Sequence, residues 1–308
     1  DGDVNFYGVY ATLKAFKPLS ISGYWLFVRD ARSINDTNFS APVEWLEDII
    51  GRDDYDSTEL HTVGTRLFGE AGNWDYDLEL AYQFGEADAV GARFRPAGFN
   101  YGDDGAEFDA WGGDIEVGYS MELCWLRRIY AGGAYFGGED NRDVDFFEWL
   151  ISSRTPDASV SFNRMFPSYS YTEIWDRPRS MSNAYQARIG VELQPTETIS
   201  ADVMLAYYGA VEPFDMPAYA TFGDFRVPLA PALSFWTHEG SGDIGLLSTL
   251  RITYNYSEDL SFRLCWQHLF SGDGVQDGAF FTDNGLSSVM GTDDADADYI
   301  DVEAVLKF

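Results

Sequence analysis

The stretch WDYDLELAYQFG at residues 74–85 alternates between apolar and polar side chains with a period of two. Its even positions carry Trp, Tyr, Leu, Leu, Tyr and Phe, whereas its odd positions carry Asp, Glu, Ala, Gln and Gly. Such alternation is typical of a β-strand whose two faces meet different surroundings. A row of six apolar side chains with aromatic rings at both ends favours lipid on that face, because transmembrane barrels place aromatic girdles at both membrane interfaces.

Equivalent rows run through the rest of the chain and predict eleven strands, each longer than ten residues. Strands of soluble sheets are typically about five or six residues long. The greater length suits strands that cross a membrane at a tilt. The predicted ranges are about 4–16, 19–32, 59–71, 74–88, 106–121, 124–138, 182–195, 198–210, 243–256, 260–270 and 297–308.

The connections between these strands alternate between short turns, such as Glu122–Leu123, and long segments. Outer-membrane barrels have short periplasmic turns and long external loops. We therefore predict that residues 1–308 form a single all-β domain, a transmembrane antiparallel β-barrel of the outer-membrane type. A soluble β-sandwich or propeller is the alternative, and a further hairpin between 158 and 176 stays open. The external loops are predicted near 33–58, 89–105, 139–181, 211–242 and 271–296.

The predicted number of strands is odd. With short turns in the periplasm, the first strand runs inward from the cell exterior and the last one ends in the periplasm at Phe308. Bacterial single-chain barrels have an even number of strands. We therefore expect Asp1 to be an artificial or proteolytic start, and an N-terminal segment or a second chain to complete the barrel.

The composition of the 308 residues excludes several classes of protein. Aromatic residues make up 17% and hydrophobic residues 45% of the chain, which is too much for a disordered protein. The net charge of −31 opposes binding to nucleic acid, because phosphates attract basic proteins. Cys124 and Cys265 fit neither a disulfide framework nor a zinc site, and we expect both to be unpaired. The chain contains no run of 18 or more apolar residues, so the sequence predicts no transmembrane helix.

Two stretches resemble the alginate-export family of outer-membrane porins. The first is TVGTRLFGEAGNWDYDLELAYQFGEAD at 62–88, which is similar to the paired-strand signature of that family. The second is the end of the chain, where an aromatic strand reaches a Gly-Asp turn and a final strand ends in Phe. The residues that carry the resemblance are Gly64, Arg66, Leu67, Tyr76, Glu79, Gln83, Gly85, Gly272, Asp273 and Phe308.

This resemblance implies a monomeric channel of eighteen strands that exports or admits a polymer or a small anionic solute, without a cofactor. The eleven strands predicted here would then form the C-terminal part of that barrel. In the member that names the family, a lumen rich in Arg and Lys matches an anionic uronate polymer. The present sequence departs from that pattern, because alternation places nine acidic side chains beside seven basic ones in the lumen.

The predicted lumen side chains are the candidate selectivity residues. An inward arginine can bind a carboxylate or sulfate of a passing solute by two parallel hydrogen bonds. Alternatively, each arginine pairs with a neighbouring lumen acid, for example Arg66 with Glu79 across one hairpin. The candidates are Lys14, Arg29, Arg66, Glu79, Gln83, Arg128, Arg188, Glu192, Arg251 and Arg263; the other lumen acids are Asp75, Asp77, Asp114, Glu116, Asp202, Asp301 and Glu303.

Two acidic clusters in the long connections could bind Ca²⁺, which prefers several oxygen ligands. The alternative is a solvated acidic loop at the cell surface, because neither cluster has the complete EF-hand pattern. The candidate ligands are Asp53, Asp54 and Asp56 in the first cluster, and Asp293, Asp294, Asp296 and Asp298 in the second.

Residues 40–51 and 143–152 share a Glu-Trp-Leu core and are each predicted to form a short amphipathic helix. Such helices could constrict the mouth of a pore, bind a partner or pack on the loop bases. His61 and His268 fall on outward rows near strand ends, and His238 has no partner at triad spacing. No pattern of residues predicts an enzyme.

Two functional hypotheses follow for a protein in the outer membrane of a Gram-negative bacterium. The first is a porin-like channel, embedded in outer-membrane lipid, that passes a polysaccharide or a small solute by passive diffusion. The second is a structural or docking barrel whose acidic loops bind an extracellular or envelope assembly. A lumen plugged by loops or by another chain would favour the second hypothesis.

Overall fold

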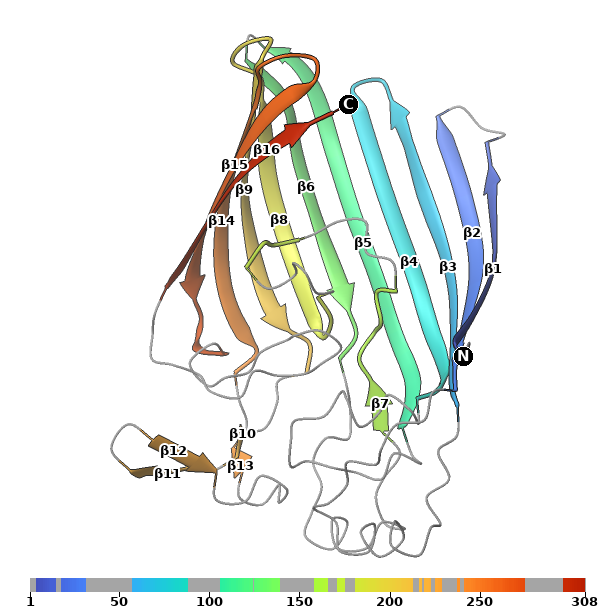
Figure 1. Ribbon diagram of the computed structural model, residues 1–308. Coiled ribbons are helices and arrows are strands. Elements are labelled where there is room, and N and C mark those ends of the chain that lie inside the picture. The colour runs from blue at the N-terminus through green and yellow to red at the C-terminus, as the bar shows by residue number, and fades with distance from the viewer. Residues whose placement is uncertain are drawn as a thin grey trace, which may run out of the picture.

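A computed structural model describes eleven long strands that form one curved antiparallel sheet (Figure 1). The described residues are 4–14, 18–31, 57–87, 106–123, 125–138, 158–165, 171–174, 181–212, 216–217, 219–222, 225–228, 237–238, 241–274 and 296–307. The long strands are β1 (Val4–Leu13), β2 (Leu19–Asp30), β3 (Thr58–Ala71), β4 (Trp74–Glu86), β5 (Ala106–Leu123), β6 (Leu126–Phe136), β8 (Ala184–Leu193), β9 (Ile199–Ala210), β14 (Asp243–Asn255), β15 (Leu260–Ser271) and β16 (Ala297–Leu306).

All eleven predicted strands are confirmed, with small shifts at their ends. The turn predicted at Glu122–Leu123 is wrong, because both residues belong to β5 and β6 begins at Leu126. In the described part of 158–176 there is no additional hairpin; β7 (Ala158–Val160) pairs with β5 in parallel instead. Two small pairs lie apart from the main sheet: β10 (Met216–Pro217) with β13 (Thr237–His238), and β11 (Tyr219–Phe222) with β12 (Phe225–Pro228).

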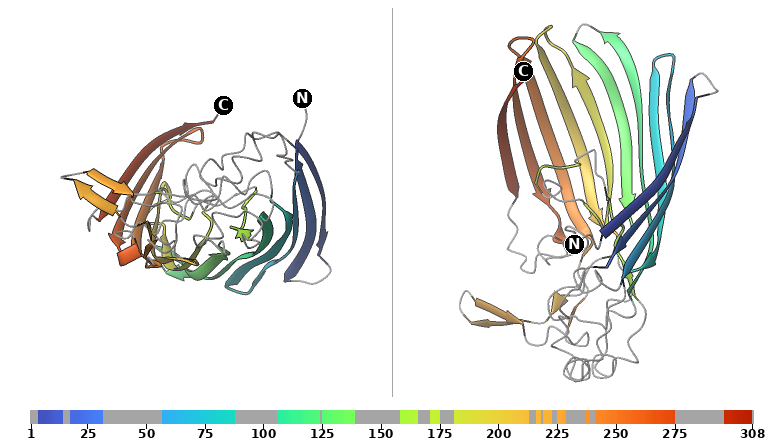
Figure 2. Two further views of the ribbon diagram at one scale, coloured as in Figure 1. Left: turned by 90° about the horizontal axis from the view of Figure 1, so that it is seen from below. Right: turned by 45° about the vertical axis from the view of Figure 1, so that its right-hand side comes forward.

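The sheet is an open arc in the described residues, with β1 and β16 as its two edges (Figure 2, left). Every long strand is antiparallel to its neighbours, so the short turns gather at one end of the arc (Figure 1, top). β1 begins at the end away from the short turns and β16 finishes at the end where they gather, as an odd number of antiparallel strands requires (Figure 1). None of the described residues forms a helix that is long and apolar enough to span a membrane.

The outer face of the arc is apolar between two aromatic zones. Its middle carries exposed aliphatic side chains such as Leu80, Ile115 and Ile189. At the end away from the short turns, the His61 ring stacks between Phe27 and Phe84, with ring centroids 4.4 Å and 5.0 Å away. At the other end, Trp74 lies edge-on to Tyr119. This distribution is that of a lipid-facing barrel surface with two interface girdles.

The inner face divides into two halves. Nearer the short turns, it carries ionised side chains on almost every strand. Farther from them, small residues face inward and pack against Phe162 and Tyr171, which belong to the connection between β6 and β8. We call residues 161–165 and 171–174 the inserted segment, because they lie inside the curve of the sheet (Figure 2). Small alanines on the wall leave the room that this segment occupies; they are Ala81, Ala110, Ala134, Ala184, Ala206 and Ala210.

Candidate functional site in the barrel lumen

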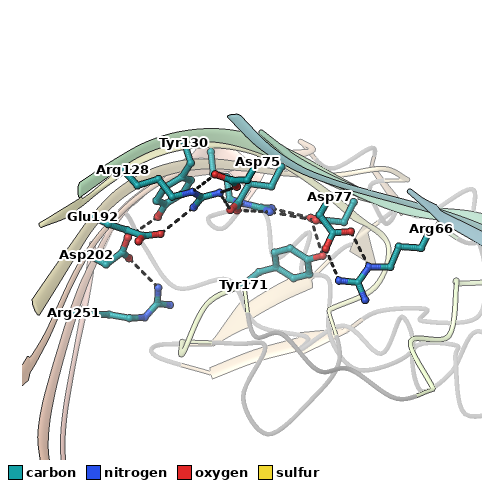
Figure 3. A network of polar contacts seen from close by, with 12 residues as sticks. Arg66, Asp75, Asp77, Arg128, Tyr130, Tyr171, Glu192, Asp202 and Arg251 are labelled. Atoms are coloured by element: carbon teal, nitrogen blue, oxygen red, sulfur yellow. Dashed lines mark hydrogen bonds and ion pairs between the residues drawn. The ribbon is translucent and has the colours of Figure 1, made fainter. Parts of the chain in front are cut away.

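Four arginines on the inner face and their acidic partners form a connected group that we call the lumen belt (Figure 3). The arginines are Arg66 on β3, Arg128 on β6, Arg188 on β8 and Arg251 on β14. The strand register places these arginines beside inward-facing acids. Arg128 lies opposite Glu192, and Arg251 lies opposite Asp202. The arginines and acids of the lumen belt therefore hold one another in place.

Arg128 joins three strands of the lumen belt. Its Nε donates to Asp75 at 3.0 Å, and its two terminal nitrogens each reach a carboxylate, of Glu116 and of Glu192, at 2.9 Å. Arg188 is the more deeply buried cation, with a side chain that is only 3% exposed. It donates to Asp114 at 2.9 Å and to Glu116 at 3.0 Å. Glu116 therefore bridges the two arginines.

Arg66 does not form the predicted pair with Glu79. Its guanidinium makes two parallel hydrogen bonds to Asp77, one of them from Nε at 2.8 Å. Glu79, directly opposite Arg66 in register, accepts a hydrogen bond from the Tyr24 hydroxyl at 2.6 Å. The prediction failed because it considered only the residue opposite, whereas a long side chain on a tilted strand also reaches its diagonal neighbour.

Glycines allow side chains of the lumen belt to reach acids two strands away. The Arg128 side chain lies against Gly118 of β5 on its way to Asp75 of β4. Tyr24 lies in the same way over Gly64 of β3 and reaches Glu79 of β4. A methyl group at either glycine would overlap the side chain that crosses it. The belt therefore depends on the absence of a side chain at these positions.

We expect Gly118→Ala to destabilise the barrel by about 1–3 kcal/mol, the usual cost of overpacking. The new methyl group would displace Arg128 from three carboxylates. Gly23→Ala on β2 is the matched control, since no atom of the described part of the chain lies within 4 Å of its added methyl group. Urea unfolding of the refolded barrel in detergent measures both changes, and an equal effect of the two substitutions would contradict this role of Gly118.

Of the other three predicted basic residues, Arg263 lies on an inward row of a described strand, whereas Arg29 and Lys14 do not. Arg29 lies on the outward face of β2 together with Trp25 and Phe27, and its Nε is 3.5 Å from Glu59. Its predicted position in the lumen is therefore wrong, because Leu26 and Val28 hold the inward positions at that end. Lys14 is exposed and follows the end of β1. Arg263 faces the lumen, where its terminal nitrogen is 3.8 Å from Glu303.

All nine predicted lumen acids fall on inward rows, whereas only five of the seven predicted bases do. Arg164 of the inserted segment supplies a sixth base that the sequence did not suggest. The described lumen thus carries more carboxylates than cations, and the excess is larger than alternation predicted. This excess is a property of the whole wall rather than of one site.

Two glutamines fasten the inserted segment to the wall. The buried Gln83 side chain of β4 donates to the Asn163 carbonyl at 2.8 Å and accepts from the Asn163 amide at 2.7 Å. On β15, the buried Gln267 oxygen accepts from the Glu173 amide at 2.8 Å and from the Thr172 hydroxyl at 3.2 Å. We call these two glutamines the clamps. Each also donates to the threonine directly opposite it, Thr62 or Thr249.

Tyr171 connects the inserted segment to the lumen belt. Its hydroxyl donates to Asp114 at 3.0 Å, and its own carbonyl accepts from the Tyr208 hydroxyl at 2.7 Å. Burial raises the pKa of the Tyr171 phenol well above its usual range, and the nearby Asp114 carboxylate acts in the same direction. Arg164 lies 4.7 Å from the centre of the same ring. Tyr171 is therefore held neutral, as a hydrogen-bond donor.

Sequence reasoning named Gln83 as a lumen residue but did not identify its partner in the inserted segment. The missed residues are Asn163, Arg164, Tyr171, Thr172 and Glu173, together with Gln267. One available signal was the series of inward alanines on neighbouring strands, because a lumen wall without bulky side chains leaves room for another part of the chain.

The two predicted calcium clusters are described only in part. Asp298 accepts from Trp266 Nε1 at 2.9 Å and lies 3.0 Å from His268 Nδ1, and Asp296 accepts from the Ser271 amide. His268 lies on the outward face beside Phe270, as predicted. Among the residues that the structure covers, no group of three or more acidic, histidine or cysteine side chains could hold a metal ion.

The predictions outside the described residues concern Asp53, Asp54, Asp56, Asp293, Asp294, Cys124, Phe308 and the helices at 40–51 and 143–152.

Comparison with known proteins gives one family and several distant structures. A family model described as alginate export matches residues 1–284. No curated protein matches the sequence. The FrpB iron transporter from Neisseria meningitidis is 9% identical with a TM-score of 0.40, and the match covers 86% of this chain and 35% of FrpB. The copper transporter OprC is 12% identical with a TM-score of 0.38, over 98% of this chain and 41% of OprC.

The toluene transporter TodX from Pseudomonas putida is 9% identical, with a TM-score of 0.30, and the match covers 86% of this chain and 63% of TodX. The chain thus spans less than two thirds of each of these three proteins. Likenesses this distant say nothing about which solute the lumen described here would admit.

Proposed function

Because this chain belongs to the alginate export family and forms an outer-membrane β-barrel of a Gram-negative bacterium, we propose that it passes a polysaccharide or small solute by passive diffusion. The family match agrees with the resemblance of residues 62–88 and also includes the strands before residue 59. The outward apolar band contacts outer-membrane lipid. A catalytic step forms no part of the proposal, since exporters bind and release their cargo unchanged.

The lumen belt is the observation that carries this proposal. A plugged structural barrel can fill its interior with apolar side chains, whereas this wall keeps Arg128, Glu192, Asp202 and Arg251 partly exposed to the interior. Fixed charges of this kind control which ions and solutes enter a water-filled pore. We therefore regard the belt as the selectivity element of the channel.

The two edges of the described sheet, β1 and β16, support the proposal that the complete barrel contains further strands. Among the described strands, β1 and β16 each pair on one side only. Backbone groups on the other side of such a strand would have no water to bind within a membrane, so both edges need partners. We propose that a further segment or a second chain supplies these strands, up to the eighteen that the family resemblance implies. A structure of the protein in membranes with β1 paired to β16 would contradict this proposal.

Ion conduction by the full-length protein in planar bilayers tests the channel. We expect discrete conductance steps with a preference for K⁺ over Cl⁻, because carboxylates outnumber arginines on the lumen wall. Glu192→Gln should lower that preference by roughly twofold at low ionic strength, where charges are weakly screened. Glu59→Gln, on the outward face, is the control and should leave it unchanged. An anion preference, or equal effects of both substitutions, would contradict the role of the belt.

The second candidate function is a structural or docking barrel whose acidic loops bind an extracellular or envelope assembly. One observation favours it: the clamps hold the inserted segment inside the barrel. Absence of conduction under all voltages and salt concentrations, from protein shown to be folded, would support this function over the first.

A further inference from the structure

A cavity of about 560 Å³ lies between the inserted segment and the wall formed by β1 to β8. Its lining includes Tyr10, Tyr24, Arg66 and Glu79 from the wall, and Arg164 and Tyr171 from the segment. This volume is within the usual range of small-molecule sites, roughly 300–1,000 Å³. The cavity therefore has room for a small solute without displacement of the inserted segment.

Three arginines line this cavity, Arg66, Arg164 and Arg188, and one of its carboxylates has no arginine hydrogen-bonded to it among the described residues. Four acids line it, and three of them are bound to arginines: Asp77 to Arg66, and both Asp114 and Glu116 to Arg188. The fourth, Glu79, accepts a hydrogen bond only from the neutral Tyr24 hydroxyl among the described residues. Arg66 is near Glu79, but its guanidinium is already committed to Asp77 by two hydrogen bonds.

An aromatic surface lies beside this carboxylate. The rings of Tyr10 and Tyr24 stack with a centroid separation of 5.9 Å and an interplanar angle of 7°. Tyr24 is fixed by the hydrogen bond to Glu79, whereas the residue Tyr10 is 58% exposed. An electron-rich ring face next to a carboxylate that no arginine binds attracts a cation by two independent interactions, a charge-assisted hydrogen bond and a cation–π contact.

We propose that this cavity binds a small hydroxylated solute that carries a protonated amine, such as an amino sugar. The amine donates to Glu79 and lies against the tyrosine rings, while the ion pairs around the cavity offer both donors and acceptors to hydroxyl groups. A uronate of the same size is disfavoured, because its carboxylate meets Glu79. The inference rests on the proposed channel function, for which it names the class of solute.

Three sugars that share one ring and differ in charge provide the test: glucosamine, glucose and glucuronate. Calorimetric titration of the full-length protein in detergent measures binding without any need for conduction. We expect glucosamine to bind about tenfold more tightly than glucose, and glucuronate to bind more weakly than either. Glu79→Gln keeps an acceptor for Tyr24 and should abolish the preference for glucosamine; Tyr10→Leu, at an exposed position, should weaken it.

Glu303→Gln is the matched control, since it also removes a lumen carboxylate but lies outside the cavity and should preserve the preference. Equal affinity for the three sugars, or an unchanged preference in Glu79→Gln, would overturn the proposed site. Channel function is judged separately in bilayers. Glucosamine binding without conduction would refute the channel and retain the site, whereas conduction without a glucosamine preference would refute the site alone.

Discussion

Arg188→Met is expected to destabilise the folded barrel by about 3–5 kcal/mol, the usual cost of removing one partner from a buried ion pair. Methionine retains much of the apolar stem, so the main loss is the positive charge. That loss leaves Asp114 with only the Tyr171 hydroxyl as a partner among the described residues and leaves Glu116 with Arg128, at a place where the Arg188 side chain is only 3% exposed. Reversible urea unfolding of the barrel in detergent or lipid gives the change directly.

Arg263→Met is the matched control for this prediction. Its side chain is 56% exposed and its terminal nitrogen lies 3.8 Å from Glu303, and exposed pairs typically contribute about 0–1 kcal/mol. A second test adds Asp114→Asn to Arg188→Met. Removal of one unbalanced carboxylate should recover part of the lost stability, so the two changes should not be additive. Equal destabilisation by Arg188→Met and Arg263→Met would show that burial of the charge is unimportant.

The fold could be predicted from the sequence because each face of a strand repeats with a period of two. The row at 74–85 and the rows of β8, β15 and β16 place apolar side chains outward, and the pairing of neighbouring strands agrees with each of them. Arg29 shows the limit of the method. A shift of one residue exchanges the two faces, and at that end of β2 both faces carry apolar residues, so the pattern is ambiguous.

Partners within the lumen could not be predicted from alternation alone. Register gives the residue directly opposite, but Arg66 and Arg128 both bond to acids away from that position. Which acid an arginine reaches depends on whether a glycine, such as Gly118, opens the path. In the sequence a glycine alternates like any other strand residue, and its effect on the side chains of neighbouring strands appears only when three strands are assembled.

The inserted segment was hidden from sequence reasoning for a different reason. Its contacts link residues far apart in the chain, as between Gln267 and Glu173, and no local periodicity reports them. The helices predicted at 40–51 and 143–152 drew attention to the mouth of the barrel, whereas the segment observed inside it follows them in the chain. Whether those helices form remains a prediction, as do the calcium clusters.

The double variant Gln83→Leu/Gln267→Leu, which removes both clamps, is expected to have a higher conductance than the wild type. Leucine is close to glutamine in size but cannot bond to the inserted segment. The variant loses four hydrogen bonds to that segment, two at Asn163 and two at Thr172 and Glu173. At about 0.5–1.5 kcal/mol each, these bonds total roughly 2–6 kcal/mol, and every 1.4 kcal/mol changes a population tenfold.

Single-channel recording of the full-length protein measures this effect, and limited proteolysis reports the accessibility of the segment independently. The conductance of each single variant should lie between those of the wild type and the double variant, because Tyr171 still connects the inserted segment to Asp114 and Tyr208. Gln186→Leu is the matched control. Gln186 is another buried glutamine on the inner face, and neither of its side-chain polar atoms has a hydrogen-bond partner among the residues that the structure describes, so its replacement should leave conductance unchanged. Unaltered conductance and proteolysis in the double variant would show that the clamps do not hold the inserted segment in the lumen.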